Sequence, residues 1–167
     1  MLDWITGALA ISGRIPEREV ARLAYVHHIN AVIDLRAEWC DDAALLASHG
    51  LSFLHLPTPD LAAVTPDMLD LGVLHARREF RAGRRVLVHC EWGIGRSALL
   101  ALCILSAEGM APLDALRLAK ARRPRLSPSP AQYDAWADWL MQQGLDPPGF
   151  AAFSEIAYSH LAAEAAV

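Results

Sequence analysis

The sequence predicts an α/β domain of three layers, in which helices flank both faces of a mainly parallel central sheet. Short runs of apolar and β-branched residues alternate along the chain with longer segments of helical periodicity. This alternation is typical of βαβ units, whose crossover helices pack on the sheet. A chain of 167 residues, of which 54% are hydrophobic and 20% charged, is long enough to bury the core of such a domain.

Four segments are predicted to be strands. AVIDL at 31–35 is short, apolar and rich in β-branched residues, which is typical of a strand buried on both sides, and RVLVH at 85–89 is a second apolar strand. The other two strands cover 4–12 and 51–56. Pro57 and Pro59 exclude a helix directly after the 51–56 strand, so a loop is expected there.

Helices are expected between and after these strands. Thr65 and Pro66 fit the cap and the first position of one helix, and Gly50 fits the left-handed residue that ends another. The predicted helices cover 16–28, 41–49, 66–81, 97–108, 112–122, 129–143 and 151–165. Because parallel sheets collect their ligands at the carboxyl ends of the strands, a functional site is expected where RVLVH ends.

The composition disfavours several classes of function. The net charge is −4 and no basic run is longer than a pair, so the chain lacks the electrostatic footprint of a nucleic-acid-binding protein. The N-terminus has no basic region of a signal peptide, and the longest uncharged apolar run, 97–107, is shorter than the ~20 residues that span a bilayer. Three cysteines without paired spacing indicate free thiols in a reducing compartment. We therefore expect a cytoplasmic monomer without nucleic-acid or membrane partners.

The sequence HCEWGIGRS, at 89–97, has the features of an anion-binding loop. It joins the end of a buried strand to the start of a helix, where unpaired backbone N–H groups and the helix dipole attract negative charge. Gly93 and Gly95 allow backbone conformations that turn consecutive N–H groups inward. Phosphate is therefore expected to bind the residues of this loop: Glu91, Trp92, Gly93, Ile94, Gly95 and Arg96.

Cys90 and Arg96 lie at the two ends of this loop and are its candidate nucleophile and phosphate-binding residue. The guanidinium of Arg96 can place two parallel N–H donors on two phosphate oxygens. The positive potential of the loop favours the thiolate form of Cys90, and a thiolate beneath a bound phosphate is placed to attack phosphorus. The alternative is a buried structural cysteine that happens to precede an arginine, and the paired glycines and Ser97 disfavour it.

These nine residues resemble the signature loop of the cysteine-dependent protein tyrosine phosphatases, in which His-Cys and five further residues precede Arg-Ser. The resemblance covers about 9–140, and the short chain is similar to the compact atypical dual-specificity branch. It implies that 1–145 form a catalytic domain that hydrolyses phosphomonoesters through a cysteinyl-phosphate, without metal or cofactor. Residues 146–167 are then expected to be a helical extension packed on this domain or trailing from it.

The resemblance also implies roles for the residues beside the cysteine. It assigns His89 to shaping the loop and keeping the cysteine ionised, and the Ser97 hydroxyl to contacting the sulfur as a leaving group. A histidine at a strand end can also be an ordinary core residue, and a serine can simply cap the helix. Cys103 is expected to be a core residue and Cys40 a surface thiol, with a regulatory disulfide to Cys90 as the alternative.

A proton must be delivered to the leaving oxygen, and Asp60 is the predicted donor. The family carries such an aspartate on a loop about thirty residues before the cysteine, and Asp60 follows a predicted strand thirty residues before Cys90. Pro57 and Pro59 stiffen its approach, while the loop is long enough to open and close. Asp67 is the competing candidate, but an acid in the first turn of a helix already has a structural purpose.

Two further residues bear on the resemblance. Glu91 places a carboxylate beside the thiolate, which would disfavour ionisation unless the side chain points outward. Gln132 lies near the position of a recurring family glutamine that could orient water in the second step. An exposed position in the first turn of a helix is the simpler interpretation of Gln132.

The predicted substrate is a phosphorylated protein or peptide, with phosphotyrosine preferred. The five residues between Cys90 and Arg96 include no lysine, arginine or histidine, so a second phosphate would meet Glu91 and an apolar rim of Trp92 and Ile94. The alternatives are a phosphoinositide or nucleotide phosphatase, a rhodanese-like sulfurtransferase and a phosphate-binding module without turnover. The last of these has no use for a thiolate and an acid.

Overall fold

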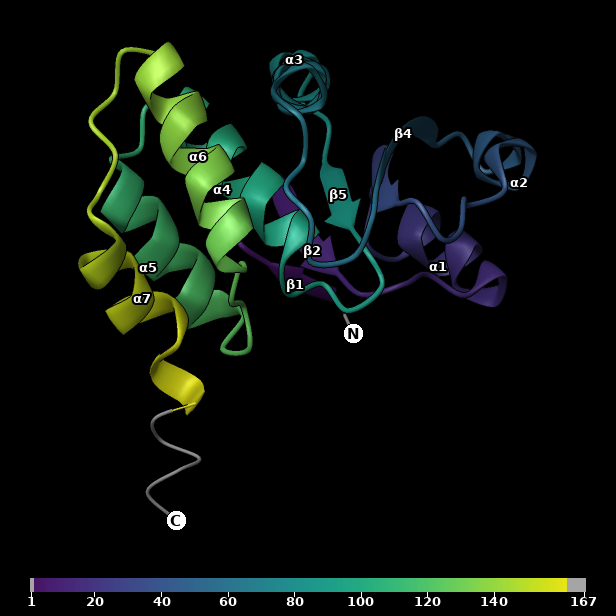
Figure 1. Cartoon of the computed structure of the whole chain (residues 1–167). Helices are drawn as coiled ribbons and strands as arrows, with labels where there is room; N and C mark the ends of the chain where they lie inside the picture. Colours follow the sequence, from purple (N-terminus) through teal and green to yellow (C-terminus); the bar gives the residue numbers. More distant parts are fainter. Residues whose placement is uncertain (1, 162–167) are drawn as a thin grey trace.

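The computed structural model describes residues 2–161 and has a five-stranded sheet at its centre, in the order β1-β2-β5-β3-β4 (Figure 1). The strands are β1 (Leu2–Trp4), β2 (Leu9–Ser12), β3 (Ala31–Arg36), β4 (Ser52–Thr58) and β5 (Val86–His89). β2, β5, β3 and β4 are parallel, and the edge strand β1 is antiparallel to β2. The predicted class, a mainly parallel sheet flanked by helices, is confirmed.

Helices cover both faces of this sheet. They are α1 (Val20–Tyr25), α2 (Ala43–Ser48), α3 (Pro66–Arg81), α4 (Arg96–Ala107), α5 (Pro112–Arg122), α6 (Pro130–Gln142) and α7 (Phe150–Ala157). Figure 1 shows α4 to α7 on one side of the sheet and α1 and α2 on the other. None of the helices within 2–161 combines the length and the hydropathy that crossing a bilayer requires.

The sheet separates two cores of unequal size. Successive residues of a strand point to opposite faces, so Val86 and Val88 of β5 pack in the larger core while Leu87 packs in the smaller one. The larger core receives buried residues from α3 to α7, and the smaller core receives them from α1 and α2.

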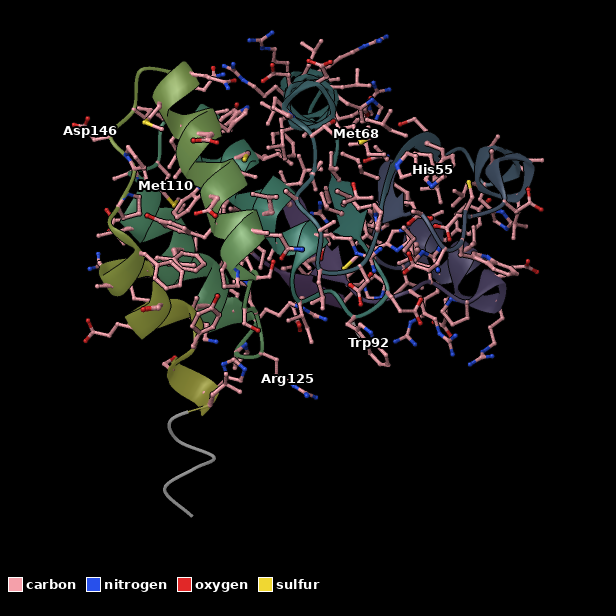
Figure 2. All side chains as sticks on the ribbon, viewed as in Figure 1. His55, Met68, Trp92, Met110, Arg125 and Asp146 are labelled. Carbon is pink, nitrogen blue, oxygen red and sulfur yellow. The ribbon has the colours of Figure 1, made fainter. Side chains whose placement is uncertain are left out.

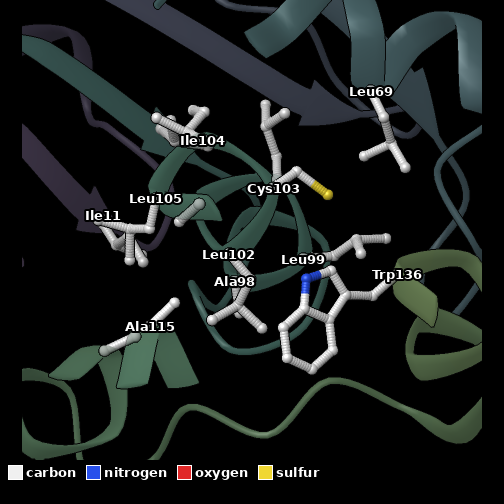
Figure 3. Close-up of a cluster of buried hydrophobic side chains, with 14 of the residues drawn as sticks. Ile11, Leu69, Ala98, Leu99, Leu102, Cys103, Ile104, Leu105, Ala115 and Trp136 are labelled. Carbon is white, nitrogen blue, oxygen red and sulfur yellow. The ribbon is translucent and has the colours of Figure 1, made fainter. Parts of the chain in front are cut away.

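α4 is the central helix of the larger core, which explains why its sequence is apolar on all sides. Every residue from Arg96 to Ser106 is buried. Figure 3 shows Cys103 inside this cluster, with its sulfur on the side of Leu69. Complete burial raises the pKa of the Cys103 thiol well above its ordinary value, as expected for a core residue that stays protonated.

The ends of several elements differ from the prediction. The single strand predicted at 4–12 is wrong, because the chain turns back between β1 and β2, and the Thr6 hydroxyl accepts hydrogen bonds from the N–H groups of residues 8 and 9. The helix predicted at 16–28 is shorter: a 3₁₀ turn at Glu17–Glu19 leads into α1, which ends at Tyr25. β4 continues through Pro57, which an edge strand tolerates because one side of it carries no ladder.

The C-terminal extension contributes to the larger core. Phe153 of α7 is fully buried, and its ring lies 4.8 Å from that of Tyr133 and 6.0 Å from that of Trp136, both on α6. α7 also packs against α5. The helix predicted at 151–165 therefore begins one residue earlier and ends at Ala157, and the last four predicted residues lie outside the described part of the chain.

Candidate active site

Three loops meet at the carboxyl edge of the parallel strands, where the sequence places the site. β3, β4 and β5 run in the same direction, so the loops that follow them lie at one edge of the sheet. We call them the Glu38 loop (37–42, after β3), the Asp60 loop (59–64, after β4) and the Cys90 loop (90–95, after β5). Arg96, the first residue of α4, follows the Cys90 loop and contacts both other loops.

The carbonyl groups of the Cys90 loop are held from outside. Four successive carbonyl oxygens accept hydrogen bonds: that of Glu91 from the backbone N–H of Arg14, those of Trp92 and Gly93 from the guanidinium of Arg123, and that of Ile94 from the backbone N–H of Ser127. Arg123 is itself fixed by an ion pair with Asp3, at 2.6 Å. It follows the end of α5, and sequence reasoning had assigned it no role.

The hydrogen bonds to the carbonyl oxygens turn the N–H groups of the same peptides towards the interior of the loop. A trans peptide is planar, with its C=O and N–H bonds in opposite directions, so the N–H groups of residues 92–95 face the interior of the loop. The N–H of Gly93 donates to Cys90 Sγ at 3.3 Å. Gly93 has a φ of +68°, and a Cβ there would lie 2.5 Å from the carbonyl oxygen of Ser12, so this position requires glycine.

Cys90 lies at the bottom of this loop and is buried. Its sulfur is 3.4 Å from the hydroxyl oxygen of Ser97, which is also buried. Ser97 lies in the first turn of α4, after the Gly95 cap, so contact with the sulfur replaces the capping role considered for it. Cys40, by contrast, is an exposed free thiol.

Arg96 is buried, and the Glu38 carboxylate binds both terminal nitrogens of its guanidinium. Its two terminal nitrogens each lie 2.8 Å from an oxygen of Glu38, and one of them also donates to the carbonyl oxygen of Thr58 at 2.8 Å. Its Nε is buried and has no hydrogen-bond partner among residues 2–161. Burial by itself would lower the pKa of Arg96, but the bonds to Glu38 and the nearby charges more than offset this and raise it.

Glu38 is a second residue that sequence reasoning missed. The hydrogen bonds from Arg96 lower the pKa of its carboxyl to about 2, so it is ionised throughout the neutral range. The available signal was its position, two residues beyond the end of a buried parallel strand. In such sheets the ligand binds outside the carboxyl ends of the strands, so a charged residue in a loop there is a candidate site residue.

The structure brings Asp60, and not Asp67, to the site. Asp60 Oδ1 lies 3.1 Å from a terminal nitrogen of Arg96, and its side chain is 55% exposed. Asp67 occupies the first turn of α3, after the Thr65 cap, where it has the structural position expected of it.

Gln132 joins the Asp60 loop to the Cys90 loop, and the expectation that it is exposed is wrong. It is buried, its Nε2 donates to the carbonyl oxygen of Ala62, and its Oε1 accepts from the N–H of Ser129 in a capping box. The Ser129 hydroxyl donates to the carbonyl oxygen of Leu61 at 2.9 Å. A Cβ on Gly95 would lie 2.5 Å from Gln132 Oε1, which explains the second glycine of the loop.

The side chains of Glu91 and Trp92 point away from the centre of the Cys90 loop. The Glu91 carboxylate lies 3.7 Å from both Arg14 and Arg36, so its charge faces two guanidinium groups. Trp92 is 64% exposed, and Figure 2 shows it projecting from the same edge of the molecule as Arg125. These two residues, with Ile94 and Arg14, line a groove of about 970 Å³ beside the loop.

His89 lies behind the loop and is fully buried. Its Nε2 is 2.8 Å from Oδ2 of Asp41, a residue of the Glu38 loop. The predicted residues Cys90, Arg96, Ser97 and Asp60 therefore gather around one loop, while His89 supports that loop from behind.

Comparison with known proteins identifies a family and several solved structures with the same fold. The catalytic domain of dual specificity phosphatases is the family that matches the sequence, over residues 18–141. Among solved structures, Tk-PTP in its active form is 26% identical, with a TM-score of 0.77 over 84% of this chain and 97% of that one. No relative was found among curated proteins.

Two further structures share the fold at lower identity. PTPMT1 is 22% identical, with a TM-score of 0.79 over 85% of this chain and 95% of that one, and its complex with PI(5)P also matches. Human DUSP28 is 18% identical, with a TM-score of 0.74 over 86% of this chain and 95% of that one.

The Arg123 contacts yield the first prediction. Arg123→Lys keeps the charge but cannot hold both carbonyl groups, and a lost hydrogen bond costs about 1 kcal/mol. Inorganic phosphate or tungstate should then bind about fivefold more weakly, which competitive inhibition of aryl phosphate hydrolysis measures. Arg122→Lys, at an exposed neighbouring position, is the control and should bind as the wild type does. Equal binding by both variants would show that the inward N–H groups do not depend on Arg123.

The Glu38–Arg96 ion pair yields a prediction of stability against pH. The pKa of Glu38 in the fold is about 2, below its ordinary value of 4.5, so the pair contributes fully above pH 4.5 and its contribution is lost as the pH falls towards 2. Glu38→Gln should therefore be less stable than the wild type at pH 6, with a difference that shrinks through this window. Urea midpoints at several pH values measure it, with Glu108→Gln, in an exposed pair with Arg77, as the control. A difference that stays constant down to pH 2.5 would contradict the assignment.

Proposed function

Because the chain belongs to the dual specificity phosphatase family and is a cysteine-based phosphatase, we propose that it acts on phosphorylated proteins, with phosphotyrosine as the preferred ester. The observation that carries the proposal is the composition of the Cys90 loop and its rim. The inward N–H groups of the loop suit a single phosphate, and the indole of Trp92 is exposed beside them.

In the proposed reaction Cys90 is the nucleophile and Asp60 the acid. The Cys90 thiolate forms a bond to phosphorus, the bond from phosphorus to the ester oxygen breaks, and Asp60 protonates that oxygen as it leaves. Water then gives a proton to Asp60 and attacks phosphorus, which releases phosphate and regenerates the thiolate. The contact at 3.4 Å between Ser97 and the sulfur supports a role for this hydroxyl in the second step.

Arg96 and the loop stabilise the charge on the transferring phosphate in this scheme. The inward N–H groups of residues 92–95 supply donors, as does Nε of Arg96, which has no partner within residues 2–161, and these groups are fixed before substrate arrives. Glu38 binds the two terminal nitrogens of the guanidinium, at 2.8 Å, and so leaves Nε for substrate. The steps as written use no metal and no cofactor.

The rim of the site supports an aromatic ester. Each of the three loops presents an exposed apolar residue beside its charged one: Trp39 next to Glu38, Leu61 next to Asp60, and Trp92 in the Cys90 loop. Aromatic and aliphatic surface of this kind suits the ring of phosphotyrosine better than the small side chains of phosphoserine or phosphothreonine.

A phosphoinositide is the second candidate substrate. PTPMT1, which shares the fold, has been solved in complex with PI(5)P. Exposed Arg14 and Arg125 line the groove beside the Cys90 loop and could receive a second phosphate. The composition of the loop disfavours a second phosphate, because the charged side chain between Cys90 and Arg96 is the acidic Glu91.

A direct comparison of substrates tests the proposal. We expect kcat/KM for a phosphotyrosine peptide to exceed that for the phosphoserine peptide of the same sequence and that for a soluble trisphosphorylated phosphoinositide, at identical salt. Cys90→Ser, which should abolish turnover of all of them, controls for contaminating phosphatases. A higher kcat/KM for the phosphoinositide would overturn the peptide proposal and leave the cysteine chemistry standing.

The role of Asp60 yields a separate prediction. Asp60→Asn should slow hydrolysis by ~10²–10⁴-fold, the range expected when a general acid is lost. The loss should be smaller for aryl phosphates whose leaving groups have a low pKa, because these depart without a proton. Rates for a series of aryl phosphates measure this dependence. Asp67→Asn is the matched control, and the assignment is wrong if that variant, instead of Asp60→Asn, acquires the dependence on the leaving group.

A further inference from the structure

A group of buried charged residues lies behind the Cys90 loop, and the reaction as proposed assigns it no role. Asp34 and Arg36 end β3, and Asp41 follows in the Glu38 loop. Asp34 is fully buried and Arg36 nearly so. Charges in such surroundings persist where they pair with one another in good geometry, so the arrangement of this group is well defined.

Arg36 is the centre of the group. Its Nε and one terminal nitrogen bond the two oxygens of Asp34, at 3.0 and 2.9 Å, and the same terminal nitrogen lies 2.5 Å from Oδ1 of Asp41. Burial alone would raise the pKa of Asp34, but the hydrogen bonds from Arg36 more than offset this and lower it. Asp34 therefore fixes the side chain of Arg36, and this side chain in turn fixes the carboxylate of Asp41.

A cation already occupies the place between these carboxylates. Donor atoms of Asp34, Asp41 and His89 lie within 4.8 Å of one another, as the ligands of a metal ion would. A terminal nitrogen of Arg36 bonds both aspartates, so the guanidinium supplies the positive charge that a metal would otherwise provide. The group is thus built to hold side chains in place.

Both free ends of the group reach residues that flank Cys90. The second oxygen of Asp41 accepts a hydrogen bond from Nε2 of His89, at 2.8 Å, and Arg36 lies 3.7 Å from the carboxylate of Glu91. His89 is fully buried at the end of β5, and its Nδ1 has no hydrogen-bond partner among residues 2–161. Oδ1 of Asp34 lies 3.8 Å from the same Nε2, beyond hydrogen-bond distance, so the bond to Asp41 sets the orientation of the imidazole ring.

We infer that Asp41, held in place by Arg36, is a positioning residue for the phosphatase reaction. It fixes the His89 ring, and with it the strand end from which Cys90 projects towards phosphorus. A nucleophile loses much of its rate when its placement shifts by a fraction of an ångström, so the bond acts on the chemical step. The inference rests on the phosphatase activity and not on the choice of substrate, so an aryl phosphate tests it even if the peptide preference fails.

Two adjacent aspartates provide a matched pair of variants. Asp41→Asn keeps the shape, but Arg36 and His89 bond different oxygens of Asp41, and the change replaces one of these acceptors with an NH2 group. Asp42→Asn makes the same change one residue later, where the carboxylate caps α2 through the N–H groups of residues 44 and 45. We expect Asp41→Asn to lower kcat for p-nitrophenyl phosphate about 10- to 100-fold, as a displacement of the nucleophile by up to about 1 Å would. KM and tungstate inhibition should stay within about threefold of the wild type, and Asp42→Asn should keep the wild-type kcat, because asparagine caps a helix as well as aspartate does.

A double-mutant cycle tests whether Asp41 acts through His89. In a His89→Gln background, Asp41→Asn should lower kcat by less than about twofold, because the contact it serves is already gone. Full additivity of the two losses would overturn the inference. So would a kcat of Asp41→Asn equal to that of Asp42→Asn, since the bond would then be merely structural.

Arg36→Lys provides the second route if Asp41→Asn does not fold. It keeps the positive charge but cannot present the planar fork that bonds both aspartates. We expect Arg36→Lys to lower kcat as much as Asp41→Asn does. In the His89→Gln background, Arg36→Lys should likewise cause no further loss. A normal kcat in folded Arg36→Lys would show that the placement of Asp41 does not matter to the reaction.

Discussion

A guanidinium buried as deeply as that of Arg96 must be surrounded by acceptors, and in this protein they come from the carboxyl ends of two strands, β3 and β4, and the loops that follow them. Glu38 follows β3, while Thr58 ends β4 and Asp60 follows it. The hydrogen bonds that this buried cation requires therefore link the loops at the carboxyl ends of β3 and β4 to the start of α4. They leave Nε as the donor for an incoming anion, and they set Asp60 beside the place where that anion would bind.

The Cys90 loop depends in the same way on partners from outside it. A loop that turns four N–H groups inward must turn the matching carbonyl groups outward, and those need donors of their own. The N-terminal segment supplies Arg14, and the segment after α5 supplies Arg123 and Ser127. Elements remote in sequence thus preorganise an anion site whose own residues carry one basic side chain, Arg96, which fits the acidic charge of the chain as a whole.

The segment from Asp34 to Asp41 supports the site at three points. Arg36 faces Glu91, Glu38 holds Arg96, and Asp41 holds His89. The contact with Arg36 also resolves the objection raised by a carboxylate beside the thiolate, since the charge of Glu91 is directed at two guanidinium groups.

The sequence by itself determined the fold class, the positions of β3 and β5 and the anion loop, because these depend on periodicity and on glycines and charges close together in the chain. It also indicated Asp60, through its position after a strand. Only the tertiary structure decided the roles of Glu38, Asp41, Arg123 and Gln132. Their partners lie 58, 48, 30 and 70 residues away, and no local pattern encodes which buried charge or amide will meet which. Those pairings are fixed when the strands align and the unsatisfied polar groups at their ends must find one another.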